Sequence, residues 1–236
     1  MQSAIISAEG DQIVIKAIFM DYYGTVTYEN GPISVEVVKR IYKNSNAKTP
    51  EEVFRYWWKL YRGKLEEANG ADFRTQNDVA LEGFQELLEH FHCPEDAGEL
   101  LARMEEHWCT TPVYEDARKF LENVQLPVYF VTNSDDKYVS ENVKLHGLHP
   151  AGIFTSEQAK YSKPRKEIFL YALEQTGLGP EDVIHVGDSF DSDVRCPGEA
   201  GITGIWLNRD GAPVPDGVTS IKDLSELDAI IEEKSE

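Results

Sequence analysis

Five short apolar runs, rich in β-branched and aromatic residues, constrain the fold of this chain more than any other feature of its sequence. They occupy residues 13–20, 128–131, 152–154, 183–186 and 204–207. Runs of this length and composition are typical of buried strands. The later runs alternate with helical patterns at 137–145, 166–176 and 193–200. Strands that alternate with helices predict an α/β fold, with a parallel sheet covered by helices on both faces.

The stretch between the first two runs has a different character, because it contains no strand-like segment. Thr49-Pro50-Glu51-Glu52 is a good helix start, and amphipathic patterns follow at 79–91 and 97–108. We therefore expect an all-helical cap domain of residues 33–108, inserted into an α/β core domain of residues 1–32 and 109–236. A short helix over 221–231 is expected to close the core.

The charge balance of the chain limits its partners. Lys and Arg number 23 against 42 Asp and Glu, which gives a formal net charge of −19, while a hydrophobic share of 41% suffices for a core. This excess of negative charge argues against nucleic acid and anionic membrane surfaces as partners. A small anionic substrate would need a local basic group or a metal ion. We expect a monomer or a homodimer.

Three cysteines without paired spacing indicate a reducing compartment rather than a disulfide framework. Residues 1–11 carry two acidic residues and no basic segment, which is unlike a signal peptide. No apolar run is long enough to span a bilayer. Together these features predict a cytoplasmic protein.

Polar residues follow the expected strands at their carboxyl ends, where a parallel sheet gathers its functional side chains. Asp21 follows the first run, Thr132 and Asn133 follow the second, and Lys163 precedes a helix. A further acidic segment, Gly187-Asp188-Ser189-Phe190-Asp191-Ser192-Asp193, follows the fourth run. The sequence therefore predicts one cluster of these residues at the edge of the sheet.

These four segments, in this order, resemble motifs I to IV of the haloacid dehalogenase (HAD) superfamily. The resemblance covers nearly the whole chain and implies a HAD-type Rossmannoid core with a helical cap. It also implies an aspartate nucleophile, Asp21, which would form a covalent ester that water then hydrolyses. Thr132 and Asn133 would hydrogen-bond a transferred phosphoryl group, and Lys163 would place positive charge beside the nucleophile.

A Mg²⁺ site is also expected from these segments, since this ion takes one or two carboxylates together with waters and phosphate oxygens. Asp188 and Asp193 supply hard oxygen ligands beside Asp21. The resemblance adds the backbone carbonyl of Tyr23, a ligand that is independent of the side chain.

Tyr23 departs from the phosphatase motif Asp-x-Asp-x-Thr, in which the second aspartate is the general acid and base. That kind of catalysis is worth about 10²–10⁴-fold, and a tyrosine, with an ordinary pKa near 10, is a poor base at neutral pH. The segment Asp21-Tyr22-Tyr23-Gly24-Thr25 instead resembles the L-2-haloacid dehalogenases, which need no acid because halide leaves unprotonated. Arg55 resembles the cap arginine that holds the substrate in that family.

Two other positions favour the phosphatases. Dehalogenases work without metal and carry a Ser-Ser-Asn type segment where this chain has Gly187-Asp188 and Asp193. They also tend to have a tyrosine where Phe169 stands. We therefore expect a HAD-type hydrolase that acts as a Mg²⁺-dependent phosphatase on a small phosphorylated metabolite. The alternatives are a 2-haloacid dehalogenase and a catalytically weak protein that binds phosphate or metal.

Overall fold

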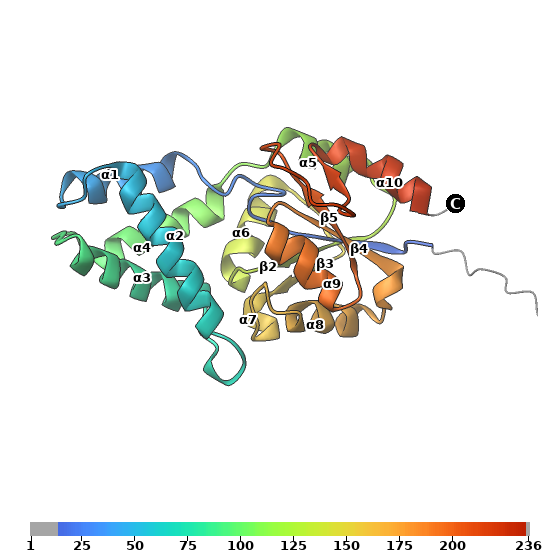
Figure 1. Ribbon diagram of the computed structural model, residues 1–236, viewed down its shortest axis with the longest axis horizontal. Coiled ribbons are helices and arrows are strands. Elements are labelled where there is room, and N and C mark those ends of the chain that lie inside the picture. Colours follow the sequence, from blue (N-terminus) through green and yellow to red (C-terminus); the bar gives the residue numbers. More distant parts are fainter. Residues whose placement is uncertain (1–13, 235–236) are drawn as a thin grey trace, which may run out of the picture.

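A six-stranded parallel sheet forms the centre of the molecule in the computed structural model, which describes residues 14–234 (Figure 1). The strand order is β3-β2-β1-β4-β5-β6. The strands are β1 (Ala17–Met20), β2 (Val128–Thr132), β3 (Gly152–Thr155), β4 (Val183–Gly187), β5 (Thr203–Leu207) and β6 (Ser220–Ile221). This sheet, with helices around it, confirms the expected α/β fold with a parallel sheet.

Helices cover both faces of the sheet, because successive residues of a strand point to opposite sides. Ile18 and Met20 of β1 pack in a core with α5 (Glu115–Asn123), α6 (Asp136–His146) and α10 (Leu227–Lys234). Ala17 and Phe19 pack on the opposite face in a core with α7 (Ser156–Ala159), α8 (Glu167–Thr176) and α9 (Cys196–Glu199). Figure 1 shows α5 and α10 above the sheet and α7 and α8 below it.

Some expected element bounds differ from those of the structure. The first strand begins at Ala17 rather than at residue 13, and Ile13 lies outside the described residues. Residues 1–11, for which no signal peptide is expected, lie outside them as well. The two-residue strand β6 was not expected. The closing helix α10 begins at Leu227 rather than at 221, because β6 and the short 3₁₀ turn η4 (Leu224–Glu226) precede it.

The expected helix over 193–200 is also different in the structure. A π-helical turn, η3 (Phe190–Arg195), comes first, and α9 follows it. Pro197 lies in the first turn of α9, where its missing N–H costs no hydrogen bond, so it begins a helix rather than kinking one. The helix over 166–176 is confirmed as α8, and Gly177 ends it with a positive φ of 68°.

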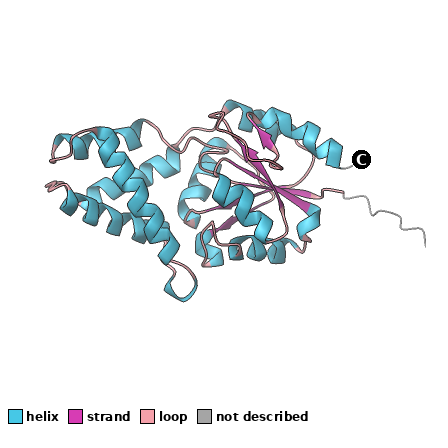
Figure 2. Ribbon diagram, viewed as in Figure 1, coloured by secondary structure: helices cyan, strands magenta, loops and turns pink. Residues whose placement is uncertain are grey.

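A group of helices with its own core stands beside the sheet and contains no strand (Figure 2). This helical group comprises α1 (Pro32–Lys43), α2 (Pro50–Glu67), α3 (Gln76–His90) and α4 (Ala97–Thr110), with the 3₁₀ turn η1 (Gly70–Asp72). Thr49 begins α2 as expected, since its side chain accepts a hydrogen bond from the Glu52 N–H at 3.2 Å. Among the helices described, none has the length and apolar character needed to cross a bilayer.

A buried hydrogen-bond network joins the end of β1 to the helical group. The hydroxyl of Tyr22, which is fully buried, donates to Asn142 Oδ1 in α6 at 2.7 Å. The Asn142 amide donates in turn to the carbonyls of Trp108 and Thr111, at 3.2 and 3.0 Å. Since buried polar groups are costly when unpaired, this network fixes the end of α4 relative to the sheet.

We predict that Tyr22→Phe lowers the free energy of unfolding by about 1–3 kcal/mol, because Asn142 Oδ1 loses its buried donor. Denaturant unfolding followed by circular dichroism measures the change. Tyr42→Phe is the matched control, since Tyr42 is only half-buried and its hydroxyl makes no hydrogen bond among the described residues. Equal stability of the two variants would show that the Tyr22 hydroxyl does not stabilise the joint.

Candidate active site

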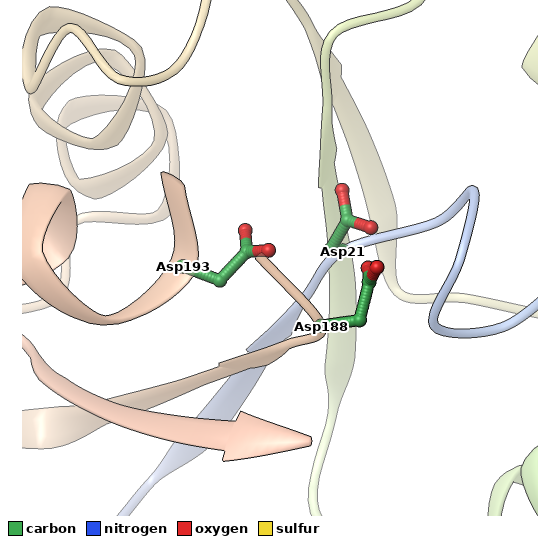
Figure 3. Close-up of side chains that lie close together, drawn as sticks. All are labelled: Asp21, Asp188 and Asp193. Atoms are coloured by element: carbon green, nitrogen blue, oxygen red, sulfur yellow. The ribbon is translucent and has the colours of Figure 1, made fainter. Parts of the chain in front are cut away.

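Three carboxylates converge at the carboxyl ends of β1 and β4 (Figure 3). They belong to Asp21, Asp188 and Asp193, and one ligand oxygen from each lies within 4.8 Å of the others. The Lys163 ammonium lies between two of them, with Nζ 2.6 Å from Asp21 Oδ1 and 2.7 Å from Asp193 Oδ1. The Lys163 side chain is only 3% exposed. The structure thus brings together these four predicted residues.

Close backbone approaches make this convergence possible. Gly24 has a φ of +97°, a backbone conformation that residues with a side chain rarely adopt. A Cβ at this position would also collide with the Asp188 carboxylate. A Cβ on Gly187 would collide with the Asp193 carboxylate. Asp188 is also held by Thr25, whose hydroxyl donates to Asp188 Oδ1 at 3.2 Å and accepts from the Asp188 N–H at 3.1 Å.

His185 is a buried residue of the site that the sequence analysis did not identify. Its Nε2 lies 3.0 Å from Asp193 Oδ1, and its Nδ1 has no partner among the described residues. Burial lowers the pKa of His185, so the ring is neutral and Nε2 donates to the carboxylate. The sequence signal was a polar residue inside the otherwise apolar run of β4.

The charges of the cluster are unbalanced. Burial is the main cause that raises the pKa of Asp21 to about 6, and it also raises the pKa of Asp188 well above its ordinary value, with Asp21 and Asp193 adding repulsion. Burial opposes ionisation of Asp193 too, but Lys163 and His185 hold its pKa below the ordinary value. Burial acts to lower the pKa of Lys163, yet its two carboxylate partners raise it. One ammonium therefore faces three acidic groups.

Thr132 and Asn133 lie at the end of β2, beside Lys163. The Asn133 side chain pairs with the Lys163 backbone, donating through Nδ2 to the carbonyl at 2.8 Å and accepting from the N–H at 2.6 Å. Asn133 therefore orients the lysine loop, in addition to the expected contact with substrate. Thr132 and Asn133 both line the cavity above the cluster.

The Tyr23 side chain turns toward the helical group. Its hydroxyl donates to the Trp108 carbonyl at 2.9 Å, and its ring lies edge-on to that of Tyr22. Burial raises the pKa of Tyr23 well above its ordinary value. A hydroxyl with this pKa, already bonded to a carbonyl, is a poor proton donor to a ligand.

A cavity of about 990 Å³ extends from the carboxylates to the helical group. Its wall on the helical group is largely apolar, and α2 contributes the aromatic residues Trp57, Trp58 and Tyr61 to it. Arg62 also lines it, with the guanidinium 5.5 Å from the centre of the Trp58 ring. Arg55 is not part of this wall.

The structure does not bring Arg55 to the cluster. Arg55 is exposed, and its Nε donates to the Glu51 carbonyl of its own helix at 3.3 Å. Arg62, two helical turns further along α2 and on nearly the same side of the helix, lines the cavity instead, so the position along α2 decides which arginine reaches the site. Glu29, in the loop before α1, also lines the cavity and carries no motif that would have identified it.

The oxygens that remain free suit a divalent cation. No side chain within residues 14–234 donates to Asp21 Oδ2 or Asp188 Oδ2, whereas Asp193 uses both oxygens, since Oδ2 accepts from the Ser189 N–H at 2.9 Å. Two free carboxylate oxygens, in a cluster with excess negative charge, match the hard ligands that Mg²⁺ prefers. Asp21 and Asp188 thus fit the expected site better than Asp193.

Comparison with known proteins agrees with this geometry. The family model of haloacid dehalogenase-like hydrolases matches residues 15–201. Among curated proteins, the chain is 29% identical over 163 residues to YfnB of Bacillus subtilis, described as a HAD-hydrolase, a match that covers 65% of this chain and 69% of YfnB. It is 30% identical over 132 residues to the phosphoserine phosphatase of Thermus thermophilus, which covers 53% of each protein.

Solved structures share the fold at low sequence identity. A magnesium-bound structure of YfnB superposes with a TM-score of 0.77 at 21% identity, and covers 93% of this chain and 99% of that one. The L-2-haloacid dehalogenase of Xanthobacter autotrophicus superposes with a TM-score of 0.75 at 17% identity, with the same coverage. The family match spans more than half of the sequence, and the chain therefore belongs to the haloacid dehalogenase-like hydrolases.

Proposed function

We propose that this hydrolase is a Mg²⁺-dependent phosphatase that acts on a small phosphorylated compound. The observation that carries the proposal is the charge of the cluster, in which Asp21, Asp188 and Asp193 face the single ammonium of Lys163. An anionic substrate would be repelled by this arrangement unless a cation were bound. The free oxygens of Asp21 and Asp188, with the backbone carbonyl of Tyr23, would hold that cation.

Asp21 is the nucleophile in this proposal. Lys163 and the surrounding protein fix the orientation of its carboxylate, and Lys163 also supplies positive charge where the transferred phosphoryl group becomes more negative. Thr132 would hydrogen-bond a phosphoryl oxygen, and Asn133 keeps the lysine loop in position. Bound Mg²⁺ would neutralise phosphoryl charge and orient that group.

The cavity indicates where the rest of the substrate would lie. Its aromatic residues on α2 suit a leaving group with an apolar face, while Arg62 and Glu29 offer polar contacts in the same cavity. Two related phosphatases by name, the phosphoserine phosphatase of Thermus thermophilus and the N-acylneuraminate-9-phosphatase of Homo sapiens, agree with the phosphatase class. They match only about half of this chain, so the compound itself is not inferred from them.

Carbon–halogen hydrolysis is the second candidate, and Tyr23 is the observation that favours it. This side chain replaces the second carboxylate of the phosphatase motif, and its hydroxyl is bonded to the Trp108 carbonyl rather than directed at a leaving group. Halide needs no proton to depart. A protein that binds phosphate or metal with little turnover is the third candidate.

We predict that the purified protein hydrolyses p-nitrophenyl phosphate in the presence of Mg²⁺, and that EDTA abolishes the activity. Asp21→Asn should remove turnover, because the amide is not a nucleophile. Nitrophenolate release measures this, and 2-haloacids are tested in parallel by halide release.

Asp228→Asn is the control for this variant, since Asp228 is exposed on α10, away from the cavity. Halide release that persists in EDTA would overturn the phosphatase proposal in favour of the dehalogenase. Phosphatase activity that survives in Asp21→Asn would overturn the role of Asp21.

The raised carboxylate pKa values predict that Mg²⁺ stabilises the protein more at neutral than at acidic pH. The folded-state pKa of Asp21 is raised to about 6, so the folded protein holds this proton more tightly than the unfolded chain does. The free energy of unfolding therefore falls as pH rises from about 4 through 6. Mg²⁺ offsets this cost only where the carboxylates are ionised. At saturating Mg²⁺ we expect the Tm to rise by about 5 °C or more near pH 7.5, and by much less near pH 5.

Thermal unfolding with and without Mg²⁺ at the two pH values measures this difference. Asp188→Asn should lose most of the Mg²⁺ effect, and Asp228→Asn should keep it. An equal shift at both pH values, or a shift retained by Asp188→Asn, would contradict the metal site.

A further inference from the structure

The proposed phosphatase reaction requires a proton donor for any leaving group that is strongly basic, and Tyr23 is unsuited to that role. Its hydroxyl is bonded to the Trp108 carbonyl, and burial raises its pKa well above the ordinary value. The proton must then come from another group that borders the same cavity.

Glu29 borders the cavity together with Asp21 and Asp188. It lies in the loop between the end of β1 and α1, and its backbone is bonded to α4 of the helical group. Glu29 is exposed to solvent as a whole residue, although enough protein lies around its carboxyl group to raise the pKa of that group.

The backbone of Glu29 is fixed from two sides. Its carbonyl accepts a hydrogen bond from His107 Nε2 in α4 at 2.9 Å. The preceding residue, Tyr28, donates its N–H to the Pro112 carbonyl at 3.0 Å and accepts from the Thr111 hydroxyl at 2.7 Å. These bonds hold the backbone of the loop in place beside the cavity that Glu29 lines.

The charges around Glu29 keep its proton available near neutral pH. Burial is the main cause that raises the pKa of Glu29 to about 7; Asp21 and Asp193 add to the rise, and Arg62 and Lys163 oppose it. The titratable or charged groups that face Glu29 from the surrounding elements are Asp21, Asp188, Asp193, Lys163, Arg62, Tyr61, Tyr114 and His107. A carboxyl group in this range can both donate and accept a proton at working pH.

We propose that Glu29 is the acid–base group of the active site, and that it replaces, from the loop before α1, the carboxylate that Tyr23 displaces. This inference rests on the proposed phosphatase function. In this proposal Glu29 gives a proton to the leaving group and later removes a proton from the attacking water.

In the first step, an Asp21 oxygen bonds to phosphorus and the bond from phosphorus to the leaving oxygen breaks. That oxygen takes the proton of the Glu29 carboxyl group and departs as an alcohol. In the second step, the Glu29 carboxylate removes a proton from water as the water oxygen bonds to phosphorus. The bond between phosphorus and Asp21 breaks, which releases inorganic phosphate, restores the Asp21 carboxylate and leaves Glu29 protonated.

Glu29→Gln tests this assignment, because glutamine keeps the size of the side chain and cannot exchange the proton. Two substrates separate the roles, since nitrophenolate leaves without a proton and an alkoxide does not. We expect kcat/KM for glycerol 2-phosphate to fall by about 10²–10⁴-fold, and kcat/KM for p-nitrophenyl phosphate to fall by less than about tenfold. Slow hydrolysis of the covalent intermediate should also produce a burst of nitrophenolate in the variant.

The pH profile identifies a proton donor in a way that a structural role would not. In the wild type, kcat/KM for glycerol 2-phosphate should fall as pH rises through the pKa of Glu29, because only the protonated group donates. Glu29→Gln should lose this fall, and Glu29→Asp should regain part of it. Tyr23→Phe should keep the fall. Glu67→Gln, an exposed position of α2 outside the cavity, is the matched control and should behave as the wild type.

The outcomes that fail are distinguishable. Wild-type protein that hydrolyses neither phosphate with Mg²⁺ would overturn the proposed function, and this inference with it. Two results would overturn the role of Glu29 alone, provided that the wild type cleaves both substrates. In one, Glu29→Gln is as active as the wild type on both; in the other, it is equally impaired on both and keeps the pH dependence. Wild-type protein that cleaves only the aryl phosphate would overturn that role as well. Thermal unfolding of each variant verifies that it is folded.

Discussion

The Lys163 ammonium, held between the carboxylates of Asp21 and Asp193, is the interaction on which the site depends. Without it, two like charges would be buried side by side, an arrangement that costs several kcal/mol. The lysine belongs to the loop before α8, while its partners follow β1 and β4. The three segments meet only because β1 and β4 are parallel neighbours in the sheet. His185 helps to orient the Asp193 carboxylate, and Asn133 helps to orient the backbone of Lys163.

One lysine does not neutralise the three carboxyl groups of the cluster. This lack of positive charge is what favours the binding of a cation. Asp188 remains beside Asp21 with a raised pKa and a free oxygen, which is the electrostatic environment of a cation site. The sheet therefore supplies groups that suit a phosphoryl group and a metal. The helical group and its connecting loop supply the aromatic wall, Arg62 and Glu29. The groups proposed to bind the phosphoryl group and the metal therefore follow strands of the sheet, whereas the proposed proton donor belongs to the loop before α1.

Much of the fold and the centre of the site could be predicted from the sequence. The strands β2 to β5 follow directly from apolar runs, and Asp21, Lys163, Asp188 and Asp193 converge because parallel strand ends share one edge. The remainder depended on packing between distant segments. Whether Arg55 or Arg62 reaches the cavity is set by where along its length α2 passes the site, because the two arginines are two turns apart on nearly the same side of the helix. The position of Glu29 is set by hydrogen bonds to α4 and the segment after it, which no local pattern encodes.

The most direct test is whether Asp21 carries the phosphoryl group during turnover. The protein would be mixed with p-nitrophenyl phosphate and Mg²⁺, quenched in acid and digested, and the peptide that contains Asp21 examined by mass spectrometry. We predict the mass of one added phosphoryl group on Asp21, increased in Glu29→Gln because hydrolysis of the intermediate is slowed. Steady turnover of the substrate with an unmodified Asp21 peptide in both proteins would contradict the nucleophilic role of Asp21.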